Sequence, residues 1–393
     1  METTTQRGTI CGVGNSTAHN AFEAGQFSAR EAVRPFGTDL PQLFVVFASR
    51  HYDLARLCQG IDSVAPEVAR IGCSTAGEIT SHGPQEHGVV ILALGGADMS
   101  ITIGCGTAVD QDLRAASAQA ARCVDEIDEH EHTVLLLLSD GLAGDQQEVV
   151  RGAYQQVGAT VSLVGGCAGD DLSMDHTVQI FRDQLLTQSV VAAAISSRRP
   201  LGIGVRHGWT QAGPLMTVTD ARGVLIRALD YEPALDAYFD ALNTPDHIRN
   251  CPDAFTAYAA TRPIGLARRG RTEIRYVATA DYERRTITCF AGVPQGALCS
   301  LMEGDSASVL TATTDAVTSA VEQLGDRPPA GLVIFDCIAR KGVLGDNLGS
   351  EIQRIRDVAN HTAVAGFYTY GEIARTCGSS GFHNQTMVVL AIG

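Results

Sequence analysis

Lysine is almost missing from this sequence, which contains only Lys341, so its positive charge is almost wholly arginine. Basic residues number 29 against 44 acidic residues, which gives a formal net charge of −15. An acidic surface repels nucleic-acid phosphates and anionic lipid head groups. We therefore expect partners other than nucleic acids and membrane surfaces, whereas this charge says little about small ligands.

Long apolar runs and an export signal are also missing. Runs such as Val134–Leu138 and Val190–Ile195 are far shorter than the roughly 20 residues of a membrane-spanning helix. Met1–Ile10 contains no basic segment followed by an apolar stretch, so we expect no secretory signal and a cytoplasmic protein. The 11 cysteines are scattered, without any C-x-x-C pair. In a reducing compartment this pattern indicates neither a disulfide framework nor a structural zinc site.

The composition nevertheless suits folded domains. Of the 393 residues, 45% are hydrophobic and 19% are charged, which is enough apolar material for extensive cores. Aromatic residues are only 6%, so aliphatic side chains must do most of the packing. A chain of this length is typical of two or three domains.

An internal repeat is the most informative feature of the sequence. Residues 72–79 (GCSTAGEI) and 366–373 (GFYTYGEI) agree at five of eight positions. Each follows an apolar segment and a helix-like stretch, and each precedes a strand-like run, at 89–94 and at 387–392. A weaker third copy ends at residues 165–170 (GGCAGD). Each copy has the pattern strand, polar turn, helix, strand and Gly-rich turn.

These units predict an α/β fold. Alternating strands and helices favour βαβ packing with at least partly parallel strand pairs, whereas the glycine-punctuated runs at 202–226 favour antiparallel sheet. We therefore predict mixed parallel and antiparallel sheets in two related lobes, built from repeated strand–turn–helix–strand units that end in Gly-rich turns. Asn243–Asp246 and Cys251–Asp253 interrupt the periodicity, and we place the domain division between residues 228 and 229.

The ordered set of motifs resembles the FIST family, whose members combine an N-terminal and a C-terminal FIST domain. The resemblance covers nearly the whole chain and assigns residues 1–228 to the first domain and 229–393 to the second. The first domain contains the motifs Phe47–Ser49, Gly72–Glu78, Leu138–Gly141, Gly165–Asp171 and His207–Trp209. The second contains Cys337–Arg340, Gly366–Ile373 and Phe382–Thr386.

The resemblance implies a sensory protein that binds a small molecule or a gas. FIST domains are thought to bind small ligands, with amino acids proposed, and to act beside signalling proteins. The C-terminal motifs, Gly371–Thr376 and Phe382–Thr386, are similar to a bacterial branch that senses nitric oxide through haem and regulates a histidine kinase or a cyclic-di-GMP enzyme. The chain contains no kinase, cyclase or DNA-binding segment, so any output must act in trans. A homo-oligomer stays an open alternative.

The Gly-rich turns are the first candidate for the ligand site. Successive backbone N–H groups at such a turn can bind an anionic group, and Glu78 and Glu372 can accept from an amine or amide. The structural alternative is that the glycines permit a positive φ and each glutamate caps a helix. The G-x-x-x-x-G-K-[ST] pattern of nucleotide hydrolysis is missing. We predict that the two turns converge, with candidate ligand-binding residues Cys73, Ser74, Thr75, Glu78, Arg340, Tyr370, Glu372 and Asn384.

His207, which precedes Gly208 at a predicted strand end, is the candidate haem ligand. An axial ligand needs a neutral imidazole with one nitrogen for iron and the other held by a hydrogen bond. The adjacent glycine leaves room for a flat porphyrin to approach. The alternatives for the iron are His51, which departs from many family members, His176 and His383. The structural interpretation is that His207 binds the backbone and joins two sheets.

A thiol-dependent enzyme built on Cys73 or Cys337 is the alternative from a different class. Such a nucleophile needs a base to form the thiolate, and Arg340 cannot accept the proton. No H-E-x-x-H or G-x-S-x-G spacing occurs in the sequence. We therefore expect a binding protein and no enzyme, and a ligand-free interaction scaffold is a further alternative.

Overall fold

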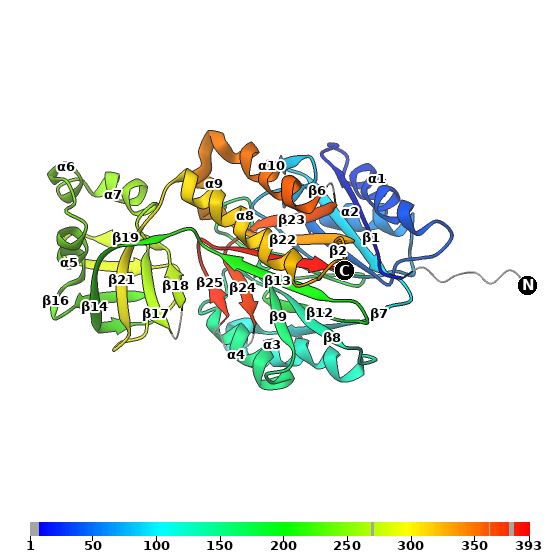
Figure 1. Cartoon of the computed structure of the whole chain (residues 1–393), viewed down its shortest axis with the longest axis horizontal. Helices are drawn as coiled ribbons and strands as arrows, with labels where there is room; N and C mark the ends of the chain where they lie inside the picture. Colours follow the sequence, from blue (N-terminus) through cyan, green and yellow to red (C-terminus); the bar gives the residue numbers. More distant parts are fainter. Residues whose placement is uncertain (1–7, 269–270, 361, 377–380) are drawn as a thin grey trace, which may run out of the picture.

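Three copies of one α/β unit follow each other along the chain, and an inserted domain interrupts the third (Figure 1). The computed structural model describes residues 8–268, 271–360, 362–376 and 381–393. The first seven residues, part of the N-terminal stretch without a predicted export signal, lie outside this range. The α/β class with mixed parallel and antiparallel sheets, which the sequence predicts, is confirmed.

Each unit has the order strand, helix, strand, helix, strand, hairpin, strand. The first comprises β1 (Ile10–Ser16), α1 (Ala21–Val33), the 3-10 turn η1 (Arg34–Phe36), β2 (Leu43–Ala48), α2 (Leu54–Asp62), β3 (Ala69–Ser74), β4 (Glu78–Thr80), β5 (Gly83–Gln85) and β6 (Val89–Gly95). The second comprises β7 (Met99–Thr107), α3 (Val109–Ala121), η2 (Arg122–Glu126), β8 (His132–Ser139), α4 (Gln147–Val157), β9 (Ser162–Cys167), β10 (Gln179–Phe181), β11 (Gln184–Leu186) and β12 (Ser189–Ser197).

The third unit has two helices, instead of one, between its second and third strands. It comprises β13 (Leu201–Arg206), α8 (Ser306–Glu322), β22 (Gly331–Cys337), α9 (Ile338–Leu344), η3 (Gly345–Asn347), α10 (Leu348–Ala359), β23 (Ala363–Thr369), β24 (Glu372–Arg375), β25 (Phe382–His383) and β26 (Met387–Ile392). The weak third copy of the repeat is therefore a full unit, and it is the second along the chain.

The three units exchange their hairpins. Each six-stranded sheet contains four strands of one unit and the two hairpin strands of another, in the orders β1-β6-β2-β3-β10-β11, β7-β12-β8-β9-β24-β25 and β13-β26-β22-β23-β4-β5. The hairpin of the first unit joins the third sheet, that of the second joins the first sheet, and that of the third joins the second sheet. The exchange is cyclic, so no sheet is complete without a neighbouring unit.

The central strands of the three sheets are buried on both faces. β2, β8 and β22 each pair in parallel with the strand that follows the next helical segment, and antiparallel with the last strand of the unit. Their sequences are nearly continuous apolar runs, such as LFVVFA in β2, because helices or other sheets cover both sides. This arrangement brings the carboxyl ends of the parallel pairs, and the Gly-rich turns that follow them, to the middle of the molecule.

A G-x-G pair in the first strand of each unit allows the following helix to pack closely. A Cβ atom at any of these glycines would lie 1.8–2.0 Å from a helix backbone oxygen. The pairs are Gly12 with Gly14, Gly104 with Gly106, and Gly202 with Gly204.

We expect Gly204→Ala to destabilise the protein, because its methyl group would lie 1.8 Å from the carbonyl oxygen of Ala316 in α8. Overpacking of this kind costs about 1–3 kcal/mol, measured as the free energy of unfolding in urea. Gly342→Ala in α9 is the control, because nothing lies within 4 Å of a Cβ there and alanine favours a helix. Equal effects of the two substitutions would contradict this account of the packing.

The inserted domain lies at one end of the molecule (left in Figure 1) and contains an eight-stranded antiparallel sheet. Its elements are β14 (Thr210–Arg222), β15 (Leu225–Leu229), β16 (Glu232–Pro233), α5 (Ala234–Ala241), α6 (Asp246–Arg249), α7 (Pro252–Ala259), β17 (Ile264–Arg268), β18 (Arg271–Arg275), β19 (Val277–Asp281), β20 (Thr286–Cys289) and β21 (Leu298–Glu303). The predicted division between residues 228 and 229 falls within β15. None of the helices in the described ranges has the length and apolarity to cross a membrane.

Candidate functional site

The Gly-rich turn of the first unit is closed by its own glutamate. Glu78 is fully buried, and its two carboxyl oxygens accept hydrogen bonds from Thr75 Oγ1 at 2.5 Å and from the Gly88 N–H at 2.8 Å. Burial raises the pKa of Glu78 to about 8 in spite of these bonds. Gly77 has a φ of 117°, which L side chains rarely adopt. The carboxyl thus fastens the turn to the residue before β6.

The turn of the third unit repeats this arrangement. Glu372 is also fully buried and accepts from Thr369 Oγ1 at 2.5 Å and from the Thr386 N–H at 3.1 Å. Burial again raises the pKa of the carboxyl to about 8. Both glutamates are therefore used by bonds within the protein, and they brace their turns instead of offering free carboxylates to a ligand.

The two Gly-rich turns that the sequence predicts to converge do lie together, and with the turn of the second unit they bind one another. Three equivalent backbone hydrogen bonds join them in a cycle: Ala76 N–H to the Tyr368 carbonyl at 3.1 Å, Gly169 N–H to the Ser74 carbonyl at 3.0 Å, and Tyr370 N–H to the Cys167 carbonyl at 3.1 Å. We call this arrangement the turn ring. Three of its N–H groups are already used in this way, which favours the structural alternative for the turns over the anion site.

Other predicted ligand-binding residues also brace the turn ring. Ser74 Oγ donates to the Gly169 carbonyl at 2.6 Å, and the Tyr370 hydroxyl donates to Asp170 Oδ1 at 2.5 Å. Asn384 is buried beside Gly371, at which a Cβ atom would lie 3.4 Å from the Asn384 amide nitrogen. The bonds of Ser74 and Tyr370 join loops of different units, so these two side chains are used within the protein.

Arg340 and the two candidate thiols lie in the interior. Arg340 is fully buried and pairs with Asp336 at 2.5 Å and with Glu351 at 2.8 Å. Burial raises the pKa of the Cys73 and Cys337 thiols well above the usual range. Both cysteines therefore stay protonated at neutral pH, so neither provides the thiolate that the thiol-dependent alternative needs.

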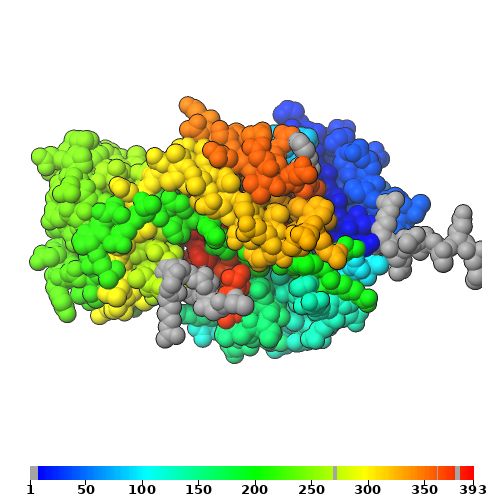
Figure 2. Space-filling model, in the orientation of Figure 1, coloured from blue at the N-terminus to red at the C-terminus, as the bar shows by residue number. Residues whose placement is uncertain are grey.

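A cavity of about 980 Å³ lies instead where the third unit meets the inserted domain. In Figure 2 the C-terminal strands (red) lie recessed in this region, between green strands and α8. We call it the junction cavity. It is lined by Ile203, Val205, Arg206, His207, Gly208, Trp209, Thr210, Thr272, Ser308, Thr311, Ala312, Asp315, Ser319, Gln323, Thr376, His383 and Thr386.

Two opposite charges line the junction cavity without pairing. Arg206, at the end of β13, donates a hydrogen bond to the carbonyl of Val205, and no carboxylate of the described residues forms an ion pair with it. Asp315 of α8 has no hydrogen bond or ion pair with any described residue. Both side chains are exposed, so both remain free to bind a charged molecule in the cavity. Hydroxyl groups of threonine and serine form most of the remaining polar wall.

His207, the candidate haem ligand, lines this cavity, and so does the alternative ligand His383. Nδ1 of His207 accepts a hydrogen bond from the Trp209 N–H at 3.0 Å. Burial, and then the charges of Arg340 and Arg206, lower the pKa of His207 to about 4. The ring is therefore neutral at pH 7, and because Nδ1 is an acceptor, the proton is on Nε2. His207 can donate one hydrogen bond from Nε2.

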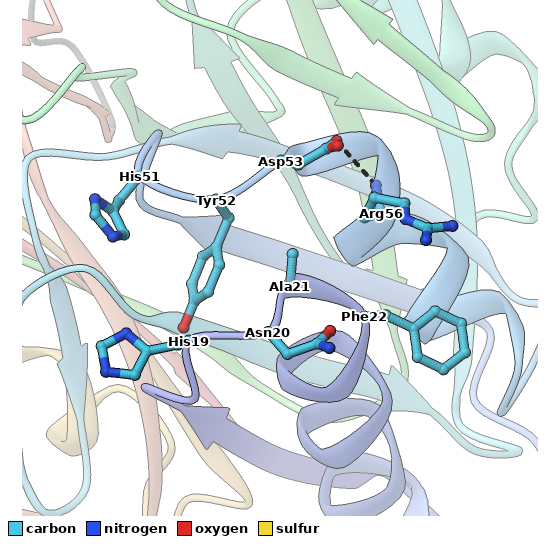
Figure 3. Close-up of a pocket in the computed structure, with 8 residues that line it drawn as sticks. All are labelled: His19, Asn20, Ala21, Phe22, His51, Tyr52, Asp53 and Arg56. Carbon is cyan, nitrogen blue, oxygen red and sulfur yellow. Dashed lines mark hydrogen bonds between the residues drawn. The ribbon is translucent and has the colours of Figure 1, made fainter.

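The three alternative histidines lie in different places. His383 is buried and lines the junction cavity, whereas His176 lies on the surface with Nδ1 2.5 Å from Asp175. His51 lines a separate pocket of about 490 Å³ at the N-termini of α1 and α2, with His19 on the other side (Figure 3). In that pocket Asp53 already caps α2 by accepting from the Arg56 N–H.

The sequence did not point to Arg206 and Asp315 as site residues. Arg206 directly precedes the motif His207–Trp209, which is a signal that could have found it. Asp315 lies on the polar face of α8, and its position near Arg206 depends on the packing of α8 against β13, with Ala316 next to Gly204. No local pattern marks such a residue.

Family models identify the chain. The FIST N domain matches residues 42–232 and the FIST C domain matches residues 234–375, so the chain belongs to the FIST family. FIST domains are generally regarded as sensory domains of signal transduction that bind small ligands. An uncharacterised protein of Mycobacterium tuberculosis is 24% identical over 387 residues, which cover 95% of this chain and 97% of that protein.

A second relative is longer than this chain. An uncharacterised protein of Methanocaldococcus jannaschii is 24% identical over 233 residues, or 57% of this chain. The match spans 45% of that relative's length.

Two solved structures similar to the chain are enzymes. A cyanuric acid hydrolase from A. caulinodans is 11% identical, with a TM-score of 0.30 over 50% of this chain and 72% of that chain. A second cyanuric acid hydrolase is 12% identical, with a TM-score of 0.34 over 98% and 100%. The expectation that the chain is no enzyme is corrected by these neighbours, because it rested only on missing catalytic motifs. At these TM-scores no activity is carried over to this chain.

Proposed function

We propose that the chain is a sensory receptor for an amino acid or a similar small zwitterionic metabolite, which binds in the junction cavity. The observation that supports this proposal is the pair of unpaired, opposite charges on the cavity wall, Arg206 and Asp315. A carboxylate of the ligand would bind the guanidinium of Arg206, and an ammonium group would bind the carboxylate of Asp315. The Nε2–H of His207 adds a neutral donor.

The position of the cavity suits a sensor. Its wall comes from β13, α8 and the C-terminal segment of the third unit, and also from Thr272 of the inserted domain. A ligand that contacts both the third unit and the inserted domain would favour the relative position of these two parts to which it binds more tightly. We propose that a partner in trans, a histidine kinase or a cyclic-di-GMP enzyme, responds to this change.

The only tryptophan, Trp209, lines the junction cavity and provides a direct assay. We expect an amino acid from a panel of the common metabolites to change its fluorescence in a saturable way. Arg206→Gln and Asp315→Asn should each weaken binding about tenfold or more, because each removes one charge-assisted hydrogen bond. Both side chains are exposed, so folding should be preserved.

Matched surface substitutions complete this experiment. Arg227→Gln and Asp220→Asn remove an exposed ion pair of the inserted domain and should leave affinity unchanged. Loss of binding in these controls, or full affinity in the two cavity variants, would contradict the proposal. Calorimetry gives the same affinities independently of Trp209.

Haem, which would supply an iron that binds nitric oxide, fits this cavity less well. The lone pair of Nδ1 of His207 is used by the Trp209 N–H and Nε2 carries the proton, so neither nitrogen of the neutral ring is ready for iron. The wall is also rich in hydroxyl groups, whereas porphyrin needs a large apolar surface. Haem and nitric oxide therefore stay a prediction, which an absorption spectrum of protein produced with haem precursor would test.

A further inference from the structure

A buried cluster in the third unit contains four polar atoms that bond no other described group, apart from a hydrogen bond between the carboxyls of Asp336 and Glu351. They are Asp336 Oδ2, Arg340 Nη1, Glu351 Oε2 and the hydroxyl of Tyr368, on side chains that are 0% exposed. Arg340 joins the two acids, because its Nε donates to Asp336 and its Nη2 donates to Glu351. Tyr368 pairs with Asp336 across β22 and β23, and burial and then the charges of Glu351 and Asp336 raise the pKa of Tyr368.

The cluster is peculiar to the third unit. Asp336 and Tyr368 face each other on β22 and β23, and the corresponding pairs are Ala48 with Ser74 and Ser139 with Cys167. Small neutral side chains therefore suffice at these positions in the other two sheets. Burying polar and charged groups costs free energy unless all their hydrogen bonds are made, so Arg340 Nη1 and the Tyr368 hydroxyl, which have no partner among the described residues, require an explanation.

We propose that Asp336, Arg340, Glu351 and Tyr368 form an internal site that binds ordered water. A metal cation would be repelled by the guanidinium, and an anion would be repelled by two carboxyl groups. Water can accept hydrogen bonds from Arg340 and Tyr368 and donate to the carboxyl oxygens, and buried water typically makes about three such bonds.

The water site is separate from the junction cavity. Thr313 of α8 lies on the cluster side, where its hydroxyl is 2.8 Å from both Arg340 Nη2 and Glu351 Oε1. Asp315, two residues further along the same helix, lines the cavity. The helix thus lies between the two sites, and a failure of the ligand proposal would leave the water proposal untouched.

Tyr368→Phe tests the site in solution. A hydroxyl without any partner gains nothing from burial, so its removal would leave the folding equilibrium unchanged or improve it. If the hydroxyl binds water, the substitution should reduce the folding equilibrium constant about fivefold, as measured by urea unfolding. Tyr238→Phe is the control, because the buried Tyr238 hydroxyl donates directly to the Arg262 carbonyl at 2.7 Å.

A crystal structure of the full chain tests the site directly. We expect ordered water within hydrogen-bond distance, about 3.2 Å, of at least two of the four atoms. A dry cluster, or side chains rearranged so that the four atoms bond one another, would overturn the proposal. So would a neutral or stabilising effect of Tyr368→Phe alongside the expected loss in Tyr238→Phe.

Discussion

Glu78→Ala and Glu372→Ala should each lower the free energy of unfolding by about 2–4 kcal/mol, because each leaves a threonine hydroxyl and a backbone N–H buried without a partner. Glu78→Gln and Glu372→Gln are the matched variants. The amide oxygen of glutamine can accept from the backbone N–H, and its NH₂ group can donate to the threonine oxygen. Urea unfolding at pH 7 should therefore separate the alanine variants clearly from the glutamine variants.

The same carboxyls should make stability depend on pH in a defined direction. Burial raises both pKa values from 4.5 in a free side chain to about 8, so the folded state holds protons that the unfolded state has released. The stabilising contribution is full below pH 4.5 and is lost as the pH rises toward 8. Between pH 7 and pH 9 the native protein should lose roughly 1 kcal/mol for each carboxyl.

The glutamine variants cannot ionise, so this part of the pH dependence should disappear in Glu78→Gln combined with Glu372→Gln. An unchanged slope in the double variant would show that other groups cause it. Equal losses in the alanine and glutamine variants would contradict the assignment of these carboxyls as braces of the turn ring.

The sequence contained the repeat but not the exchange between its copies. The shared turns at 72–79 and 366–373 predicted two related units, and the weaker copy at 165–170 was found because it has the same order of strand, helix and Gly-rich turn. The G-x-G pairs that open all three units, such as Gly202 with Gly204, were also present in the sequence. The hairpin exchange could not be predicted from the repeat, because the pairing partner of a hairpin lies in another unit. Glu78 in β4, for example, pairs with Phe367 in β23 of the third unit.

The roles of the predicted site residues could not be derived from the sequence for a related reason. A glutamate at the same position of two copies indicated either a shared ligand site or a shared structural role. The hydrogen bonds from Thr75 to Glu78 and from Thr369 to Glu372 support the structural role. Those bonds are local, at a spacing of three residues, and could have been expected. The junction cavity depends on the inserted domain, whose position follows from tertiary packing, so only the candidate iron ligands His207 and His383 of its lining were named from the sequence.

Arg340→Met should be the most destabilising single substitution in the third unit. It removes the cation from between Asp336 and Glu351 and leaves two buried carboxyls next to each other. Loss of one partner of a buried ion pair typically costs about 3–5 kcal/mol in the free energy of unfolding. Arg227→Met is the matched control, since the Arg227–Asp220 pair is exposed and such pairs contribute about 1 kcal/mol or less.

The effect of Arg340→Met should also depend on pH. The charge of Arg340 lowers the pKa of Asp336, so without the guanidinium the Asp336 carboxyl binds a proton more readily, and increasingly so as the pH falls. The difference between the variant and the native protein should therefore be smaller at pH 5 than at pH 7. Replacing all three charges, in Asp336→Asn, Arg340→Met and Glu351→Gln together, should recover much of the loss at pH 7. If the triple variant is as unstable as Arg340→Met, packing of the long side chain and not charge balance accounts for the role of Arg340.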